Sequence, residues 1–168
     1  MNLNENQIST LNRLNDAIDE GLRRGLIFLK GPFQSGKTRL LYELMKQKQL
    51  NYHEIYLNLN QFLLARLQSG SKKNPIRTFE HYSRLPAKTT ALMELYITEY
   101  LRDFFKNHSL LIIDAIELLY KYPLNLPQVL YPYCRNRNII VVAIPIDERN
   151  GFTFDWNFNL AKIIEIED

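Results

Sequence analysis

Residues 31–38, Gly-Pro-Phe-Gln-Ser-Gly-Lys-Thr, constrain this chain most, because they match the pattern G-x-x-x-x-G-K-[S/T] of a phosphate-binding loop. An apolar run at 26–29 precedes the loop and leucines at helical spacing follow it, so the loop joins a predicted strand to a predicted helix. Backbone N–H groups of such a loop and of the helix N-terminus converge on one point, which favours a bound anion. The alternative is a chance match in an ordinary turn, and the two flanks argue against it. We therefore expect nucleotide phosphates to be bound by Gly31, Pro32, Phe33, Gln34, Ser35, Gly36, Lys37, Thr38 and Arg39.

The overall composition fits one globular domain. The chain has 168 residues, of which 46% are hydrophobic and 23% charged, and its net charge is +3. Such values are ordinary and exclude no partner by themselves. The single cysteine, Cys134, cannot form an internal disulfide, so we expect a reducing compartment, the cytoplasm. The start of the chain lacks the features of a signal peptide, and no apolar run approaches the ~20 residues that span a bilayer, so we expect no membrane partner.

Apolar runs predict five strands, and helical spacing predicts helices between them. The strands are expected at 25–30, 53–59, 109–114, 138–144 and 161–166, the last at a sheet edge because its residues alternate. The helices are expected at 8–24, from the loop to about 48, and at 60–68, 89–106 and 126–136. Alternating strands and helices form an α/β fold, in which a mainly parallel sheet is covered on both faces. Ligands of such sheets bind at the carboxyl ends of the strands, where the phosphate loop lies.

We expect a single domain over residues 1–168. It would comprise an N-terminal helix in 1–24, a nucleotide-binding core in 25–145, and an edge strand with an acidic tail in 146–168.

Asp114 is the second candidate at the site, because it ends the apolar strand predicted at 109–114. Magnesium prefers six oxygen ligands and usually takes only one or two of them from the protein. Thr38 would supply a hydroxyl and Asp114 a carboxylate that holds the metal directly or through water. Lys37 should neutralise the β- and γ-phosphates. An aspartate that ends a strand is often only a helix cap, but together with the phosphate loop it predicts a Mg²⁺ site.

The spacing of the two motifs resembles the additional-strand division of P-loop ATPases, which includes the AAA+, STAND and RecA-like families. One strand, 53–59, lies between the two strands that carry the motifs. The resemblance implies a three-layer P-loop NTPase sandwich with a five-stranded sheet of order 5-1-4-3-2. Motors of this division usually carry a C-terminal lid domain. We expect none here, because the residues after 145 leave room only for one short strand and a tail.

Two positions depart from that division. Ala115 follows Asp114, where those families usually place the glutamate that polarises the attacking water, and Glu117 comes three positions after the aspartate. Glu117 is either that catalytic base or a first-turn glutamate favoured by the helix dipole. Asp147 follows the fourth predicted strand, where a carboxylate would repel phosphate oxygens. We therefore expect hydrolysis that is slow or depends on a partner.

Arg135 and Arg137 precede the fourth predicted strand. They are candidates to reach the γ-phosphate of a neighbouring subunit, as arginine fingers do. The alternative is a pair of solvated arginines near a helix C-terminus, where the dipole favours positive charge.

Four segments together resemble BrxF, the small P-loop protein family of BREX-type phage-defence systems. The resemblance covers about residues 25–145, and Ala115 departs from the Asn-Ile-Glu that tends to follow the aspartate in that family. It implies an ATP- and Mg²⁺-dependent component of antiviral defence that acts with larger partner proteins or by self-association. The segments are the phosphate loop, Tyr56-Leu57-Asn58-Leu59-Asn60, Asp114-Ala115-Ile116-Glu117-Leu118-Leu119-Tyr120, and residues 133–143.

Three alternatives remain open on the sequence alone. The segment 69–88 combines aromatic residues with Lys72, Lys73 and Arg77, which would suit double-stranded DNA or another nucleic acid; basic runs are more often solvated surface. A nucleoside- or shikimate-type kinase has a similar length and fold, but we find no second glycine-rich loop and no paired lid arginines. A non-hydrolysing nucleotide switch that controls assembly is the third.

Overall fold

The computed structural model describes residues 3–20, 25–69, 84–135 and 137–166. The candidate nucleic-acid contacts Lys72, Lys73 and Arg77 lie outside these residues, so their role stays a prediction. Within the described part of the chain, no helix combines the length and the apolarity needed to cross a membrane.

A five-stranded sheet of order β2-β3-β4-β1-β5 forms the centre of the molecule. Every pairing between these strands is parallel. Read from the other edge, this is the predicted order 5-1-4-3-2, and β5 is an edge strand as its alternation indicated. The sheet consists of β1 (Leu26–Pro32), β2 (Tyr56–Asn58), β3 (Leu110–Asp114), β4 (Ile139–Ile146) and β5 (Lys162–Glu165).

The three central strands are apolar because both of their faces are covered. Side chains at 26–29 in β1, 111–113 in β3 and 140–144 in β4 are fully buried. A strand that is buried on both faces reads as a continuous apolar run rather than an alternating one. This burial fixes the sheet and therefore fixes where the carboxyl end of each strand lies.

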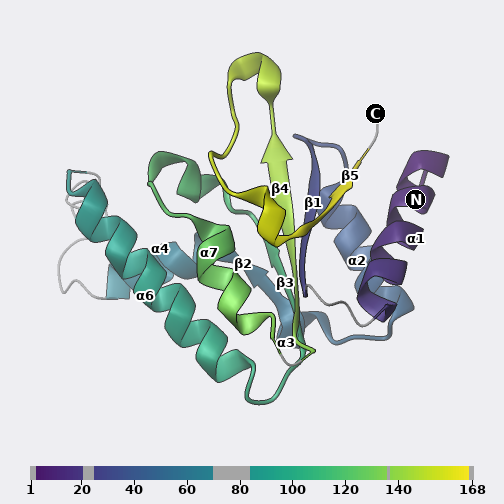
Figure 1. Cartoon of the computed structure of the whole chain (residues 1–168), viewed down its shortest axis with the longest axis horizontal. Helices are drawn as coiled ribbons and strands as arrows, with labels where there is room; N and C mark the ends of the chain where they lie inside the picture. Colours follow the sequence, from purple (N-terminus) through teal and green to yellow (C-terminus); the bar gives the residue numbers. More distant parts are fainter. Residues whose placement is uncertain (1–2, 21–24, 70–83, 136, 167–168) are drawn as a thin grey trace.

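Helices cover both faces of the sheet (Figure 1). Figure 1 shows α1 and α2 on one side of the strands, and α6 and α7 on the other. The N-terminus of α1 is held by a capping box in which Asn4 and Gln7 exchange hydrogen bonds, which satisfies N–H groups that a helix start leaves unpaired. The bounds are α1 (Glu5–Asp19), α2 (Lys37–Gln47), α4 (Leu59–Ser69), α6 (Pro86–Phe104) and α7 (Leu126–Leu130).

Residues 21–24 of the helix predicted at 8–24 lie outside the described residues. Two other predicted elements are wrong in part. Residues 53–55, predicted as strand, belong to a short helix, α3 (Tyr52–Ile55), whose first turn is capped when the Asn51 side chain accepts the His53 N–H. The helix predicted at 126–136 is α7 followed by a 3₁₀ turn, η2 (Tyr131–Tyr133). Pro132 has no N–H to continue the α-helical pattern, which explains the early end.

A hairpin-like segment joins β4 to β5. It begins where Asp147 and Phe152 exchange two backbone hydrogen bonds of 2.9 and 2.8 Å across a short 3₁₀ turn, η3 (Glu148–Asn150). In Figure 1 this turn stands beyond the carboxyl end of β4, at the top of the view. We call residues 147–152 the β4–β5 hairpin.

Candidate nucleotide-binding site

The phosphate loop adopts a backbone that only particular residues tolerate. Gly36, the last residue before α2, has φ of +89°, and Gln34 has φ of +63°. The left-handed region is costly for residues with a Cβ. A Cβ added to Gly36 would also lie 2.7 Å from Gln7 Nε2, and one on Gly31 would lie 2.8 Å from Ser35 Oγ. The two glycines of the motif therefore let the loop fold tightly onto α1 and onto itself.

Replacing Gly36 by alanine should lower nucleotide affinity about 10-fold or more, because left-handed alanine costs roughly 1–2 kcal/mol and the new methyl group meets Gln7. Gly151→Ala is the matched control: Gly151 also has a positive φ, +70°, but a Cβ there meets nothing within 4 Å. Both variants should lose some thermal stability, and only Gly36→Ala should lose binding in a titration with a fluorescent ATP analogue. Equal affinity in the two variants would contradict this account of the loop.

Lys37 lies inside the loop at the start of α2. Its Nζ donates to Gly31 O at 2.9 Å, to Ser35 Oγ at 3.3 Å, and to the carbonyl oxygen of Pro32. Burial lowers the pKa of Lys37, and the negative charges of Asp114 and Glu117 oppose that shift. The ammonium group is thus placed among the loop's own oxygens, where a phosphate would be in reach.

Thr38 and Asp114 meet although they are 76 positions apart in the sequence. Thr38 Oγ1 donates to Asp114 Oδ2 at 2.7 Å, and the hydroxyl of Tyr56 donates to the same oxygen at 3.0 Å. The other oxygen, Asp114 Oδ1, accepts the Ala115 N–H at 2.8 Å. Asp114 is 8% exposed, and these three donors satisfy a carboxylate that would otherwise be costly to bury.

The donor set fits magnesium. Thr38 and Asp114 offer oxygen atoms only, and Mg²⁺ binds through one or two carboxylate or hydroxyl oxygens plus water and phosphate oxygens. Among the described residues, no group of three or more His, Cys, Asp or Glu side chains is placed to hold a metal. Thr38 and Asp114 would supply two oxygen ligands, so the remaining ligands would have to be water and phosphate oxygens.

Glu117 is fixed by Asn60, a residue that the sequence reasoning did not single out as part of the site. Asn60 Nδ2 donates to Glu117 Oε2 at 2.9 Å, and Asn60 Oδ1 accepts the Leu118 N–H at 2.9 Å. The Asn60 N–H also donates to Ala115 O at 2.8 Å, and Ala115 has a positive φ of +55°. Asn60 lies in the first turn of α4, directly after β2, and from there clamps the turn that follows Asp114. Glu117 begins a 3₁₀ helix, η1 (Glu117–Lys121).

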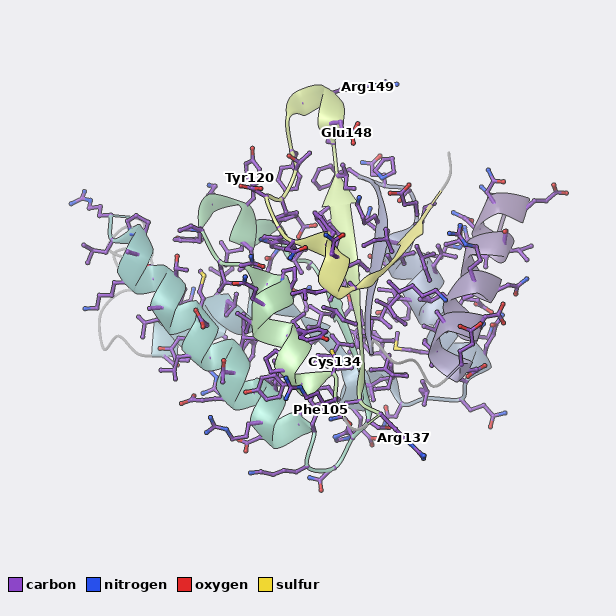
Figure 2. The ribbon with its side chains drawn as sticks, viewed as in Figure 1. Phe105, Tyr120, Cys134, Arg137, Glu148 and Arg149 are labelled. Atoms are coloured by element: carbon purple, nitrogen blue, oxygen red, sulfur yellow. The ribbon has the colours of Figure 1, made fainter. Side chains whose placement is uncertain are left out.

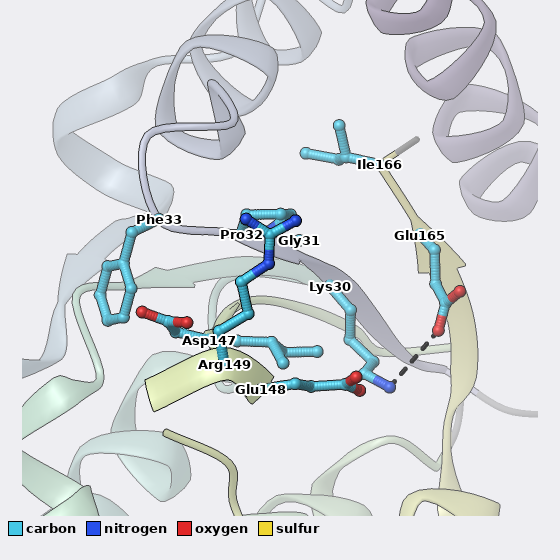
Figure 3. Close-up of a pocket in the computed structure, with 10 residues that line it drawn as sticks. Lys30, Gly31, Pro32, Phe33, Asp147, Glu148, Arg149, Glu165 and Ile166 are labelled. Atoms are coloured by element: carbon cyan, nitrogen blue, oxygen red, sulfur yellow. Dashed lines mark hydrogen bonds and ion pairs between the residues drawn. The ribbon is translucent and has the colours of Figure 1, made fainter. Parts of the chain in front are cut away.

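A pocket of about 470 Å³ lies beside the phosphate loop, between the ends of β1 and β5 and the β4–β5 hairpin. In its lining, Lys30 of β1 and Glu165 of β5 are neighbours in the strand register and form an ion pair of 3.4 Å (Figure 3). Gly31, Pro32 and Phe33 belong to its lining, whereas Lys37, Thr38 and Asp114 do not. The pocket is therefore next to the phosphate and metal positions rather than at them.

Asp147 lies in the lining of that pocket, but its carboxylate is used within the hairpin. Its two oxygens accept the backbone N–H of Asn150 at 3.2 Å and the Asn150 side chain at 2.6 Å. Arg149, which falls in the segment expected to form an acidic tail, is exposed and also lines the pocket (Figure 3). The negative charge of Asp147 is expected to repel phosphate oxygens. Arg149 places a positive charge two residues later in the same hairpin.

The hairpin also contacts the phosphate loop and η1 through aromatic rings. Phe152 packs edge-on against Phe33 of the phosphate loop, with ring centroids 5.0 Å apart. On its other side Phe152 stacks with Tyr120 of η1 at 4.3 Å, and the Tyr120 hydroxyl donates to Gly151 O at 3.2 Å. The next aromatic residues, Phe154 and Trp156, stack at 4.1 Å and cover the core.

Arg135 and Arg137 lie at the other end of the sheet from the phosphate loop. They precede β4, whose carboxyl end meets the end of β1 in a parallel register of Ile146 with Pro32. Figure 2 shows Arg137 at the opposite end of the molecule from Glu148 and Arg149. Neither arginine can reach the phosphate loop of its own chain, so a contact with a nucleotide would require a second chain, and that role stays a prediction.

Cys134 lies near the same end as Arg137 (Figure 2). Burial raises the pKa of its thiol to about 12, and its Sγ lies 3.6 Å from Leu130 O. A thiol that stays protonated is a poor nucleophile, so Cys134 is not a candidate for the chemistry of the site.

Comparisons with solved structures show the fold. No protein-family model matches the sequence, and no curated protein matches it at a significant level. A structure of AMPPCP-bound DnaA from Aquifex aeolicus aligns with 99% of this chain at a TM-score of 0.56 and 17% identity. A DNA replication initiation factor aligns with 99% of it at a TM-score of 0.52 and 18% identity. This chain spans about half the length of each, 48%. Sheet order, phosphate loop and these likenesses together show that the chain has the P-loop NTPase fold.

Proposed function

We propose that this protein binds ATP with Mg²⁺ and hydrolyses it slowly or only when a partner activates it. The phosphate loop would hold the phosphates through its N–H groups and Lys37, while Thr38 and Asp114 would hold the metal. The observation that carries the proposal is the 2.7 Å hydrogen bond from Thr38 Oγ1 to Asp114 Oδ2. It brings the two motifs to one point at the carboxyl edge of the sheet, as magnesium coordination requires. AMPPCP in the DnaA structure supports the choice of an adenine nucleotide.

Slow hydrolysis follows from how Glu117 is held. A general base needs a basic carboxylate oriented toward the attacking water. The hydrogen bond from Asn60 Nδ2 to Glu117 Oε2 stabilises the charged form of this carboxylate and ties its orientation to Asn60, and the residue directly after Asp114 is Ala115, which offers no carboxylate. A bound nucleotide or a partner that shifts Asn60 would free Glu117, so the Asn60–Glu117 hydrogen bond is where we place the control of turnover.

Replacing Glu117 by glutamine should leave ATP binding intact and reduce phosphate release about 100-fold or more, since a general base contributes ~10²–10⁴-fold. Glutamine retains an oxygen that can accept from Asn60, so the clamp should survive. Glu94→Gln on the exposed face of α6 is the control. Phosphate release is measured from ATP with Mg²⁺ under single-turnover conditions. Equal release by Glu117→Gln and wild type would show that Glu117 does not act as the base in the absence of a partner.

The role in the cell is proposed from the sequence resemblance to BrxF. We propose that the protein is a nucleotide-dependent component of a prokaryotic anti-phage defence system, acting in the cytoplasm with larger proteins or with further copies of itself. Double-stranded DNA is a second proposed partner, through Lys72, Lys73 and Arg77. Stimulation of phosphate release by duplex DNA, lost when these three residues are replaced by glutamate, would support that contact; no retention of wild type on DNA at low salt would contradict it.

One observation favours the nucleotide-switch alternative. In the β4–β5 hairpin, Phe152 packs against both Phe33 of the phosphate loop and Tyr120 of η1, and Gly151 O accepts the Tyr120 hydroxyl. A movement of the phosphate loop or of η1 would therefore shift the hairpin and its exposed tip residues Glu148 and Arg149. Tight ATP binding without any phosphate release, by wild type and by Glu117→Gln alike, would favour a switch over an ATPase.

A further inference from the structure

We propose that Tyr56 is a positioning residue for the metal ligand Asp114, which its hydroxyl holds in the orientation that magnesium requires. The inference rests on the proposed function, because it takes Thr38 and Asp114 to hold Mg²⁺ together with the nucleotide. Tyr56 itself is not a ligand in this proposal.

The contacts of Asp114 separate two kinds of donor. Thr38 Oγ1, at 2.7 Å from Asp114 Oδ2, belongs to a residue that would itself bind the metal. The Tyr56 hydroxyl lies 3.0 Å from the same oxygen. Tyr56 belongs to β2, the strand next to β3, and would not bind the metal itself. A second-sphere donor of this kind orients a metal ligand and stabilises its charge.

A stack of three tyrosines fixes where the Tyr56 hydroxyl points. The ring of Tyr56 lies 4.4 Å from that of Tyr52 at an interplanar angle of 26°, and Tyr52 lies 4.7 Å from Tyr42 at 10°. The rings come from three elements, α2, α3 and β2. The β2–β3 register then sets Asn58 opposite Asp114, two residues beyond Tyr56. A side chain that is held by its ring on one side and by the sheet on the other has little freedom to turn its hydroxyl away.

A purely structural role would have a different signature. If the Tyr56 hydroxyl only satisfied a buried carboxylate, its removal would lower stability and weaken nucleotide binding with or without metal. If it positions Asp114, its removal should leave metal-free binding unchanged and shift only the magnesium dependence. Measuring nucleotide binding both without metal and at increasing Mg²⁺ concentrations therefore separates the two roles.

The experiment compares wild type with Tyr56→Phe, which removes the hydroxyl and keeps the ring in the stack. Binding of a fluorescent ATP analogue is followed once in EDTA and once across a magnesium titration, with a thermal melt of each protein. Tyr42→Phe is the matched control, because it removes a hydroxyl from the exposed outer ring of the same stack. We expect Tyr56→Phe to raise the half-saturating Mg²⁺ concentration ~10-fold, with unchanged binding in EDTA, and Tyr42→Phe to match wild type.

Each other outcome contradicts a specific statement. An unchanged magnesium midpoint in Tyr56→Phe overturns the positioning role while leaving the proposed function standing. Loss of binding in EDTA by the same variant marks a folding role and overturns it as well. Wild type that binds no nucleotide, or binds it without any response to magnesium, contradicts the proposed function itself.

Discussion

Replacing Lys37 by alanine should abolish ATP binding, with affinity lowered at least ~100-fold. The Lys37 ammonium group lies within the phosphate loop, 2.9 Å from Gly31 O and 3.3 Å from Ser35 Oγ. Hydrogen bonds to charged groups contribute about 1.5–3 kcal/mol each, and this group would engage two phosphates. Filter retention of radiolabelled ATP in the presence of Mg²⁺ measures the loss.

Lys46→Ala is the control for that experiment, because Lys46 lies on the same helix, has a side chain that is 78% exposed and pairs with Glu43 at 3.7 Å. It should retain ATP as wild type does. Thermal melts of the variants show whether the loop still folds without the lysine, whose removal leaves the Gly31 and Pro32 carbonyl groups without that donor. Full retention of ATP by Lys37→Ala would mean that the nucleotide does not bind at the phosphate loop.

Replacing Asp114 by asparagine should remove the magnesium dependence of ATP binding and stop phosphate release. Asparagine keeps the shape of the side chain but loses the charge that holds a divalent cation. Changes of outer-shell partners cost ~10–100-fold in metal affinity, so the loss of a direct ligand should cost at least the upper end of that range. The ATP affinity of the variant is measured at increasing Mg²⁺ concentrations, alongside the wild type.

The matched control is Asp103→Asn, which makes the same chemical change on the exposed face of α6, where Asp103 pairs with Lys106 at 2.7 Å. It should show the wild-type response to magnesium. Metal-free binding by Asp114→Asn should remain close to that of wild type, because Lys37 and the loop N–H groups are untouched. If magnesium increased the ATP affinity of Asp114→Asn as much as that of wild type, Asp114 would not be a metal ligand.

The sheet could be predicted from the sequence because its signals are local. The runs at 26–29, 111–113 and 140–144 are apolar at every position, and the structure buries all of them. Parallel strands place their carboxyl ends on one edge of the sheet. The phosphate loop with Thr38 follows one such end and Asp114 lies at another, so their proximity could be predicted without knowledge of side-chain contacts. The order of the strands came from the resemblance to P-loop ATPases, and the structure has that order.

The residues that the sequence reasoning missed depend on contacts between elements. Asn60 was visible only as the end of a motif segment, and its clamp on Glu117 requires the register of β2 with β3. Tyr56 reads as an ordinary strand tyrosine until the stack with Tyr52 and Tyr42 turns its hydroxyl toward Asp114. Arg149 lines the pocket beside the phosphate loop because the Asp147–Phe152 bridge folds the hairpin next to that loop.

Calorimetric titration of the wild-type chain with ATP, first in Mg²⁺ and then in EDTA, tests the central claim most directly. The account predicts one ATP bound per chain, with an affinity that falls clearly when the metal is removed, because both the phosphate loop and the Thr38–Asp114 pair contribute. No heat of binding in the presence of Mg²⁺ would contradict the proposal that this P-loop fold carries a working nucleotide site.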